Sequence, residues 1–145
     1  MIFIVDPSVV AKWYFPEILG DRAEALKIWL LEEAHSIAAP ELFLLEMANL
    51  LWKKSALLKE IPSRTALRIY EEVSEIGVRL YPDKLLLPYA MEISLMHRSP
   101  VYDSLYLTLA RQLNTTFITA DQRLKKNLEG TRWVNRIQLL SQWQR

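Results

Sequence analysis

The chain has 145 residues, of which 51% are hydrophobic and 24% charged, so it is long enough for one sizeable core and too apolar for a disordered protein. Its formal net charge is only +1, so any affinity for nucleic acid must come from a local patch of cations. Cysteine is absent, which excludes disulfides, thiolate catalysis and zinc sites built on sulfur, and is consistent with a reducing cytosol.

The N-terminal stretch MIFIVDPSVV predicts no signal peptide, because no basic segment precedes its apolar run and a charge soon interrupts that run. The other uncharged runs of the chain are also too short for a membrane span, which needs about 18 apolar residues. We therefore expect a soluble protein of the cytoplasm.

The first half of the chain predicts two strands and four helices. Residues 2–5 (IFIV) form a short run rich in β-branched and aromatic residues, which is typical of a buried strand. Asp6 and Pro7 then predict a helix start, with Asp6 as N-cap, and the helix covers residues 8–15. The other elements predicted here are a helix at 21–34, a strand at 36–39, and helices at 40–58 and 61–77.

The second half predicts three strands and three helices. A strand at 78–81 precedes a helix at 83–97, which Pro88 should bend or delay. The next helix starts with Ser99 as its cap and Pro100 as its first residue. The remaining predictions are a strand at 115–119, a helix at 122–128 and a last short strand at 132–134.

Strands that alternate with helices predict an α/β fold, a three-layer sandwich with a short, mostly parallel central sheet flanked by helices. Without an internal repeat or a linker, residues 1–145 are expected to form a single domain. Ligands of such sheets bind at the carboxyl ends of the strands. The residues that follow 2–5 and 115–119 are therefore the first place to look for chemistry.

Two acids stand at that edge of the predicted sheet. Asp6 directly follows the first strand, and Asp121 follows the late strand after Thr119 and Ala120. Glu46 lies among apolar residues of the helix at 40–58. Asn49 is three residues further along the same helix and shares the face of Glu46.

Asp103 is the least expected of the acids, because it shares a helical stripe with Tyr106, Leu107 and Ala110 and so faces the apolar side. The positive end of the helix would stabilise it by about 0.3–1 kcal/mol, which is less than its burial should cost. Ser99 already fills the predicted cap position. Something else must compensate the charge of Asp103.

The other acids have simpler explanations. Helix capping alone would explain Asp6 and Asp121. Glu46 would need no explanation if its face of the helix were exposed. If all four acids meet at one edge, their repulsion calls for a divalent cation. Oxygen ligands of this kind suit magnesium or manganese. Zinc fits poorly, since the two histidines, His35 and His97, are far apart in sequence.

Four stretches carry a family resemblance: IVDPSVVAKW, PELFLLEMANLLWK, YDSLYLTLARQL and TTFITADQRL. Together they span most of the chain, and their order is that of the family. Each stretch alone is a weak signal, whereas all four in this order make a strong one. The chain resembles the PIN-domain ribonucleases, and most closely the VapC-type toxins of prokaryotic toxin–antitoxin pairs.

The resemblance implies a PIN-like fold and a quartet of catalytic and metal-binding acids, Asp6, Glu46, Asp103 and Asp121. It also implies that three polar residues support the quartet, namely Ser8, Asn49 and Thr119. The implied activity is metal-assisted hydrolysis of RNA phosphodiester bonds with Mg²⁺ or Mn²⁺. The implied partners are a cognate antitoxin protein and a second copy of the chain in a homodimer.

Cations near the acidic edge are candidates for contact with RNA phosphates: Lys12, Arg123, Lys125 and Lys126. The simpler alternative is that residues 122–127 form a solvated helix face. Two other functions remain open. A PIN-like module that binds RNA or protein without turnover is one. A phosphatase with an aspartate nucleophile is the other, although Ser8 stands where its D-x-D-x-T motif needs a second aspartate.

Overall fold

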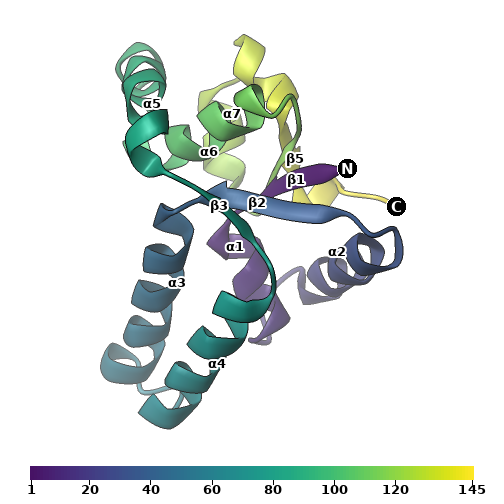
Figure 1. The fold of residues 1–145 in the computed structure, drawn as a ribbon, viewed down its shortest axis with the longest axis vertical. Helices are drawn as coiled ribbons and strands as arrows, with labels where there is room; N and C mark the ends of the chain where they lie inside the picture. Colours follow the sequence, from purple (N-terminus) through teal and green to yellow (C-terminus); the bar gives the residue numbers. More distant parts are fainter.

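A sheet of five parallel strands runs through the middle of the molecule (Figure 1). The computed structural model describes residues 1–145. The strands are β1 (Ile2–Val5), β2 (Ser36–Pro40), β3 (Arg79–Tyr81), β4 (Phe117–Thr119) and β5 (Ile137–Leu139). Their order in the sheet is β3-β2-β1-β4-β5, and every pair of neighbours is parallel. The first strand of the chain is therefore the central strand of the sheet.

Helices cover both faces of this sheet, which confirms the predicted α/β sandwich. The regular helices are α1 (Pro7–Val10), α2 (Gly20–Glu32), α3 (Leu42–Trp52), α4 (Ser63–Glu75), α5 (Asp83–His97), α6 (Val101–Gln112) and α7 (Gln122–Asn127). Four further short helical segments are η1 (Ala11–Trp13), η2 (Lys53–Leu57), η3 (Arg132–Arg136) and η4 (Leu140–Gln142). Helices α1 to α4 lie on one side of the sheet, and α5 and α6 lie on the other (Figure 1). None of the helices combines the length and the hydropathy that crossing a bilayer requires.

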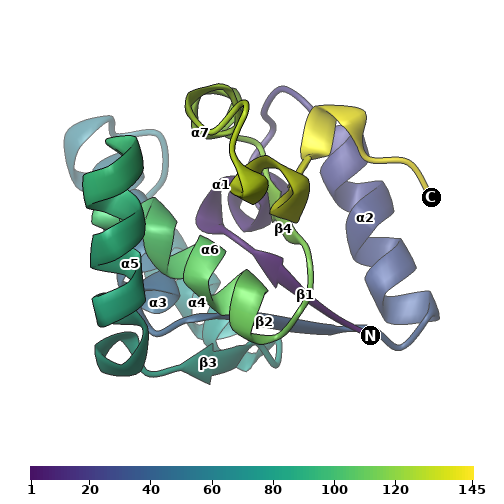
Figure 2. The ribbon, with the colours of Figure 1, turned by 90° about the horizontal axis from the view of Figure 1, so that it is seen from above.

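The core explains why α6 is apolar on nearly every side. Its residues from Ser104 to Ala110 are all buried, because α6 packs against both α5 and the strands (Figure 2). On the sheet itself, Ile4 and Val5 are fully buried. Such strands, covered on both faces, read as continuous apolar runs in the sequence.

The first helix is shorter than predicted. Regular α-helix ends at Val10 and gives way to the 3₁₀ turn η1, whereas the sequence predicted helix to residue 15. The chain turns here toward α2, and the indole N–H of Trp13 donates a hydrogen bond to the carbonyl of Ala23 at 2.9 Å. Phe15 is buried beyond this turn. Tertiary contacts with α2 therefore override the helical pattern.

The predicted last strand at 132–134 is wrong. These residues belong to the 3₁₀ helix η3, whose first turn is capped by the Thr131 hydroxyl, which accepts a hydrogen bond from the Trp133 N–H. The last strand is β5, which the sequence did not predict, and it pairs with β4 in the register Phe117↔Ile137. Pro88 lies inside α5 and does not interrupt it.

Candidate active site

The crevice between β1 and β4 is the topological switch point of the sheet. From β1 the chain continues to β2 and β3 on one side, whereas β4 and β5 lie on the other. Val5 pairs with Ile118 in the register of these two strands, so their carboxyl ends lie next to each other. Open α/β sheets bind their ligands at this position. Asp6 directly follows β1 and Thr119 is the last residue of β4, so the two residues flank this crevice.

Two hydroxyl groups hold the carboxylate of Asp6 in place. Thr119 Oγ1 donates to Asp6 Oδ2 at 2.6 Å, and Ser8 Oγ donates to Asp6 Oδ1 at 2.6 Å. Ser8 Oγ in turn accepts from the backbone N–H of Ala120 at 3.1 Å. Asp6 occupies the N-cap position of α1, where its side chain makes no hydrogen bond of capping geometry, although the backbone N–H of Val9 lies near enough to lower its pKa. The capping explanation therefore does not account for this side chain, whereas the predicted neighbours Ser8 and Thr119 both contact it.

Asp121 follows β4 at the same edge. Its backbone N–H donates to Thr119 Oγ1 at 3.0 Å, so one hydroxyl connects the backbone of Asp121 to the side chain of Asp6. Its Oδ1 caps α7 by accepting from the N–H groups of Arg123 and Leu124. The capping explanation is thus correct for Asp121. Capping uses only one of its oxygens, and Oδ2 remains available to a ligand.

Glu46 is held by a residue that the sequence did not single out. The hydroxyl of Tyr106 donates to Glu46 Oε1 at 2.7 Å. Tyr106 is itself buried and stacks on Phe117 of β4, with ring centroids 5.2 Å apart and an angle of 14° between the planes. By its spacing in the sequence, Tyr106 belongs to the apolar stripe of α6. A buried tyrosine normally finds a hydrogen-bond partner for its hydroxyl. The expected burial of Tyr106 could therefore have identified it as a partner of a nearby acid.

Asp103 is half-buried in the first turn of α6, and no hydrogen bond from the chain stabilises its carboxylate. The predicted cap of this helix is wrong. Pro100 occupies the N-cap position, and the Ser99 hydroxyl is buried without a hydrogen-bond partner. Neither residue offers a hydrogen bond to Asp103. Its burial is therefore without compensation from the chain itself.

The four acids Asp6, Glu46, Asp103 and Asp121, here called the acidic cluster, influence one another electrostatically. Burial raises the pKa of Asp6 to about 6 although the hydroxyls of Ser8 and Thr119 and the backbone N–H of Val9 oppose the rise, and repulsion by Asp103 adds to it. Burial raises the pKa of Asp103 to about 6, and repulsion by Asp121 contributes. These links connect the ends of β1, α6 and β4 in a single cluster.

Glu46 completes this electrostatic group. Burial raises its pKa to about 7, followed by repulsion from Asp6, Asp103 and Asp83, while the hydrogen bond from Tyr106 acts in the opposite direction. Asp83 is an additional acid that the sequence analysis did not consider. Its Oδ1 accepts from the N–H of Leu42 at 3.2 Å, so it binds the start of α3, the helix that carries Glu46.

The donor set fits a hydrated magnesium or manganese ion. All four groups offer hard carboxylate oxygens, and the raised pKa values of Asp6, Glu46 and Asp103 show that the chain alone does not balance the charge of these three. No three acidic or histidine side chains stand close enough together to enclose an ion by themselves. Mg²⁺ rarely needs such an enclosure, because it keeps several waters and binds through one or two carboxylates.

Asn49 and some of the predicted RNA-contacting cations lie in positions that do not favour the roles predicted for them. Asn49 is exposed and has no part in the hydrogen bonds of the acidic cluster. Lys125 Nζ is bonded to Gln142 Oε1 at 3.0 Å. Arg123 and Lys126 are exposed, and neither is paired with a carboxylate. Of the four cations, these two remain free to meet an anion.

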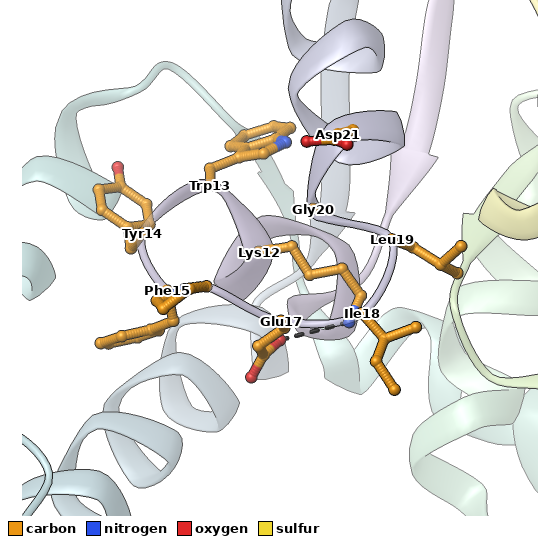
Figure 3. Close-up of a pocket in the computed structure, with 10 residues that line it drawn as sticks. Lys12, Trp13, Tyr14, Phe15, Glu17, Ile18, Leu19, Gly20 and Asp21 are labelled. Carbon is orange, nitrogen blue, oxygen red and sulfur yellow. Dashed lines mark hydrogen bonds and ion pairs between the residues drawn. The ribbon is translucent and has the colours of Figure 1, made fainter.

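Lys12 lies in a hollow of about 770 Å³ that is lined by residues 12–21 (Figure 3). Its ammonium group forms an ion pair with Glu17 at 3.3 Å, drawn as a dashed line in Figure 3. Glu17 also faces Lys54 of η2 at 3.7 Å. The hollow belongs to the loop between η1 and α2 and contains no member of the acidic cluster, so we do not regard it as the active site.

Comparisons with known proteins place this site in a family. The model of the PIN domain matches residues 3–128. The chain is 30% identical over 127 residues to Ribonuclease VapC3 of Pyrobaculum aerophilum, and the match covers 86% of this chain and 92% of that protein.

Two solved structures have a similar fold. One is VapBC2 from Rickettsia felis bound to a DNA fragment from their promoter, with a TM-score of 0.66 and 12% identity over 96% of this chain and 98% of that one. The other is PAE2754 from Pyrobaculum aerophilum, with a TM-score of 0.60 and 21% identity over 97% of this chain and 85% of that one. The match of sequence and fold confirms the resemblance seen in the four stretches, and the chain belongs to the PIN domain family.

Proposed function

We propose that this chain is a metal-dependent endoribonuclease, that residues 1–145 form its single nuclease domain, and that it is the toxin of a type II toxin–antitoxin pair. The observation that carries the proposal is the acidic cluster at the switch point of a PIN-family sheet. Its similarity to a protein named as a ribonuclease supports the activity. Because cellular RNA is the proposed substrate, the cytoplasm is the proposed place of action.

Each acid has a distinct part in holding a cation. Asp6 is fixed by two hydroxyl groups, and Glu46 is fixed by Tyr106. Asp103 and the free oxygen of Asp121 face the same cluster without a competing bond. A divalent ion held there supplies Lewis-acid chemistry, activating water and stabilising charge on the leaving oxygen. Opposite charge also keeps the acids ionised at neutral pH, where burial would otherwise return protons to them.

Cleavage of RNA in the presence and absence of metal tests the activity. We expect the purified chain to cut single-stranded RNA internally with Mg²⁺ or Mn²⁺ and to stop when EDTA is added. Cleavage that continues in EDTA would contradict the metal-dependent mechanism. Binding of RNA without cleavage under any metal would instead favour a PIN-like module that acts without turnover.

Two protein partners are part of the proposal. The similarity to VapBC2, solved on promoter DNA, supports a cognate antitoxin as one partner. A second copy of the chain is the other, because Leu95 near the end of α5 and Tyr102 at the start of α6 are large apolar side chains that stay exposed. A mass in solution near that of one 17.0 kDa chain, at micromolar concentration, would contradict the homodimer.

Replacing Tyr106 by phenylalanine tests how Glu46 is held. The ring that stacks on Phe117 remains, while the hydrogen bond to Glu46 is lost. Partners that orient metal ligands typically contribute 10–100-fold to metal affinity or activity, so we expect Mn²⁺ affinity to fall by about tenfold. Titration calorimetry measures this loss. Unchanged affinity in a folded Tyr106→Phe protein would show that Glu46 needs no such support.

A further inference from the structure

A small pocket lies at the C-terminal end of α6, whereas Asp103 of the acidic cluster lies in the first turn of that helix. The volume of the pocket is about 230 Å³. We call it the α6 pocket, and its lining residues are Tyr89, Thr108, Arg111, Gln112 and Trp133. Asp103 and Arg111 are eight residues apart on the same helix, which corresponds to roughly 12 Å along its axis. The pocket is therefore separate from the proposed catalytic site.

The one arginine that lines this pocket, Arg111, and its neighbour Arg132 both pack on the ring of Trp133 without being neutralised. The Arg111 guanidinium lies over the ring of Trp133, 5.8 Å from its centroid, and that of Arg132 lies 5.1 Å from the same ring. Neither arginine forms an ion pair with a carboxylate. Trp133 is buried, so its ring gives the exposed Arg111 side chain a fixed surface on which to pack. A guanidinium group that packs on a ring and has no carboxylate partner is suited to bind a phosphate.

The other walls of the α6 pocket suit a nucleobase. Tyr89 is 51% exposed and offers an aromatic ring on which a base can stack. Gln112 is exposed and carries both a donor and an acceptor for the edge of a base. The hydroxyl of Thr108 is buried and has no hydrogen-bond partner in the chain. An unpaired buried hydroxyl beside a polar pocket is unusual in a folded protein.

We infer that the α6 pocket is a nucleotide subsite for substrate RNA, in which Arg111 binds a phosphate and Tyr89 stacks against a base. This inference rests on the proposed nuclease function. A ligand with a phosphate but no base would make no contact with the ring of Tyr89. An apolar ligand would leave the guanidinium of Arg111 without an anion. At about 3.4 Å per nucleotide, a stacked RNA strand covers the distance between this pocket and the acidic cluster with about four nucleotides.

RNA binding measured without metal separates this subsite from catalysis. The probe is a fluorescent 12-nucleotide RNA titrated in EDTA, with anisotropy as the readout. We expect Arg111→Ala to weaken binding by about five- to tenfold and to reduce the salt slope by about 0.7. The matched control is Arg64→Ala on α4, which removes another exposed arginine without an ion pair, on the opposite side of the sheet. We expect that control to change affinity by less than about twofold.

A second measurement uses the unaltered protein, so it does not depend on the folding of a variant. Adenosine monophosphate is titrated while the indole N–H signal of Trp133 is followed by NMR. We expect this signal to shift with saturation, because Trp133 lines the pocket and its ring lies under the guanidinium of Arg111. A Trp133 signal that stays constant up to millimolar nucleotide would contradict the subsite.

The outcomes distinguish the subsite from the nuclease proposal. Equal RNA affinity of the unaltered, Arg111→Ala and Arg64→Ala proteins, with cleavage intact, would overturn the subsite and leave the nuclease function standing. RNA that binds with the Arg111 dependence but is never cut with metal would support the subsite and contradict the nuclease. RNA that is neither bound nor cut would contradict both.

Discussion

Replacing Asp103 by asparagine is expected to lower metal-dependent RNA cleavage by at least about 100-fold. Loss of a residue that only orients a metal ligand typically costs 10–100-fold, and Asp103 is proposed as a ligand itself. Asparagine has nearly the same shape, and Asp103 accepts no hydrogen bond from the chain that the change would break. The loss should therefore reflect chemistry at the site, not a misfolded protein.

The same substitution is expected to stabilise the protein in the absence of metal. Asp103 is half-buried, and its pKa is raised by burial and by repulsion from Asp121. A neutral amide removes both unfavourable contributions to the free energy of folding. We expect the melting temperature in EDTA to rise by about 2 to 4 °C for each kcal/mol gained.

The matched control is Asp21→Asn, which changes an exposed acid in the first turn of α2. Its activity and its melting temperature in EDTA should both stay close to those of the unaltered chain. An Asp103→Asn protein that melts higher in EDTA but still cuts RNA at the normal rate would show that Asp103 has no part in the metal site.

The second expected result is that, in the absence of metal, the stability of the folded chain falls as the pH rises. A divalent metal should reverse this fall. In the folded chain the pKa values of Asp6 and Asp103 are raised from 3.8 to about 6, and that of Glu46 from 4.5 to about 7. Between about pH 4 and 7 the folded state therefore binds more protons at these groups than the unfolded state does. Their stabilising contribution is fully present below about pH 4 and is lost as the pH rises to 7.

Metal acts in the opposite direction, because it binds the ionised acids. At a free concentration 100 times its dissociation constant, a ligand adds about 2.7 kcal/mol to stability, which corresponds to a rise in melting temperature of roughly 5 to 10 °C. Thermal melts at pH 5, 6, 7 and 8, in EDTA and in MnCl₂, measure both effects. The metal-induced rise should be small at pH 5 and large at pH 8.

The Asp103→Asn protein is the internal comparison for these melts. With one titrating group removed, its stability in EDTA should depend less on pH, and its response to MnCl₂ should be smaller. A rise with MnCl₂ that is equal in both proteins at every pH would place the bound metal away from the acidic cluster.

The elements predicted correctly are those whose signal is local. The strand at 2–5 is a run of β-branched and aromatic residues, and Asp6 with Pro7 marks its end. The burial of α6 follows from the spacing of its apolar residues. By contrast, residues 132–134 also favour a strand by composition, but the Thr131 cap and the burial of Trp133 hold them in a 3₁₀ turn. The actual last strand, β5, lies directly between the 3₁₀ helices η3 and η4 without a loop on either side, so no local break in the sequence marks its ends.

The sequence by itself determined the α/β class, the family resemblance and the four acids of the cluster, because each depends on short stretches with a local pattern. The resemblance also implied Ser8 and Thr119 as supports of the acids, but only the tertiary structure decided which acid each of them holds and that Tyr106 holds Glu46. Thr119 reaches Asp6 across 113 residues, and Tyr106 reaches Glu46 across 60. It also decided that Lys12 is paired with Glu17 and that Asn49 is exposed. Contacts of this length depend on the order of the strands and the packing of α6 against them, and no local spacing encodes either.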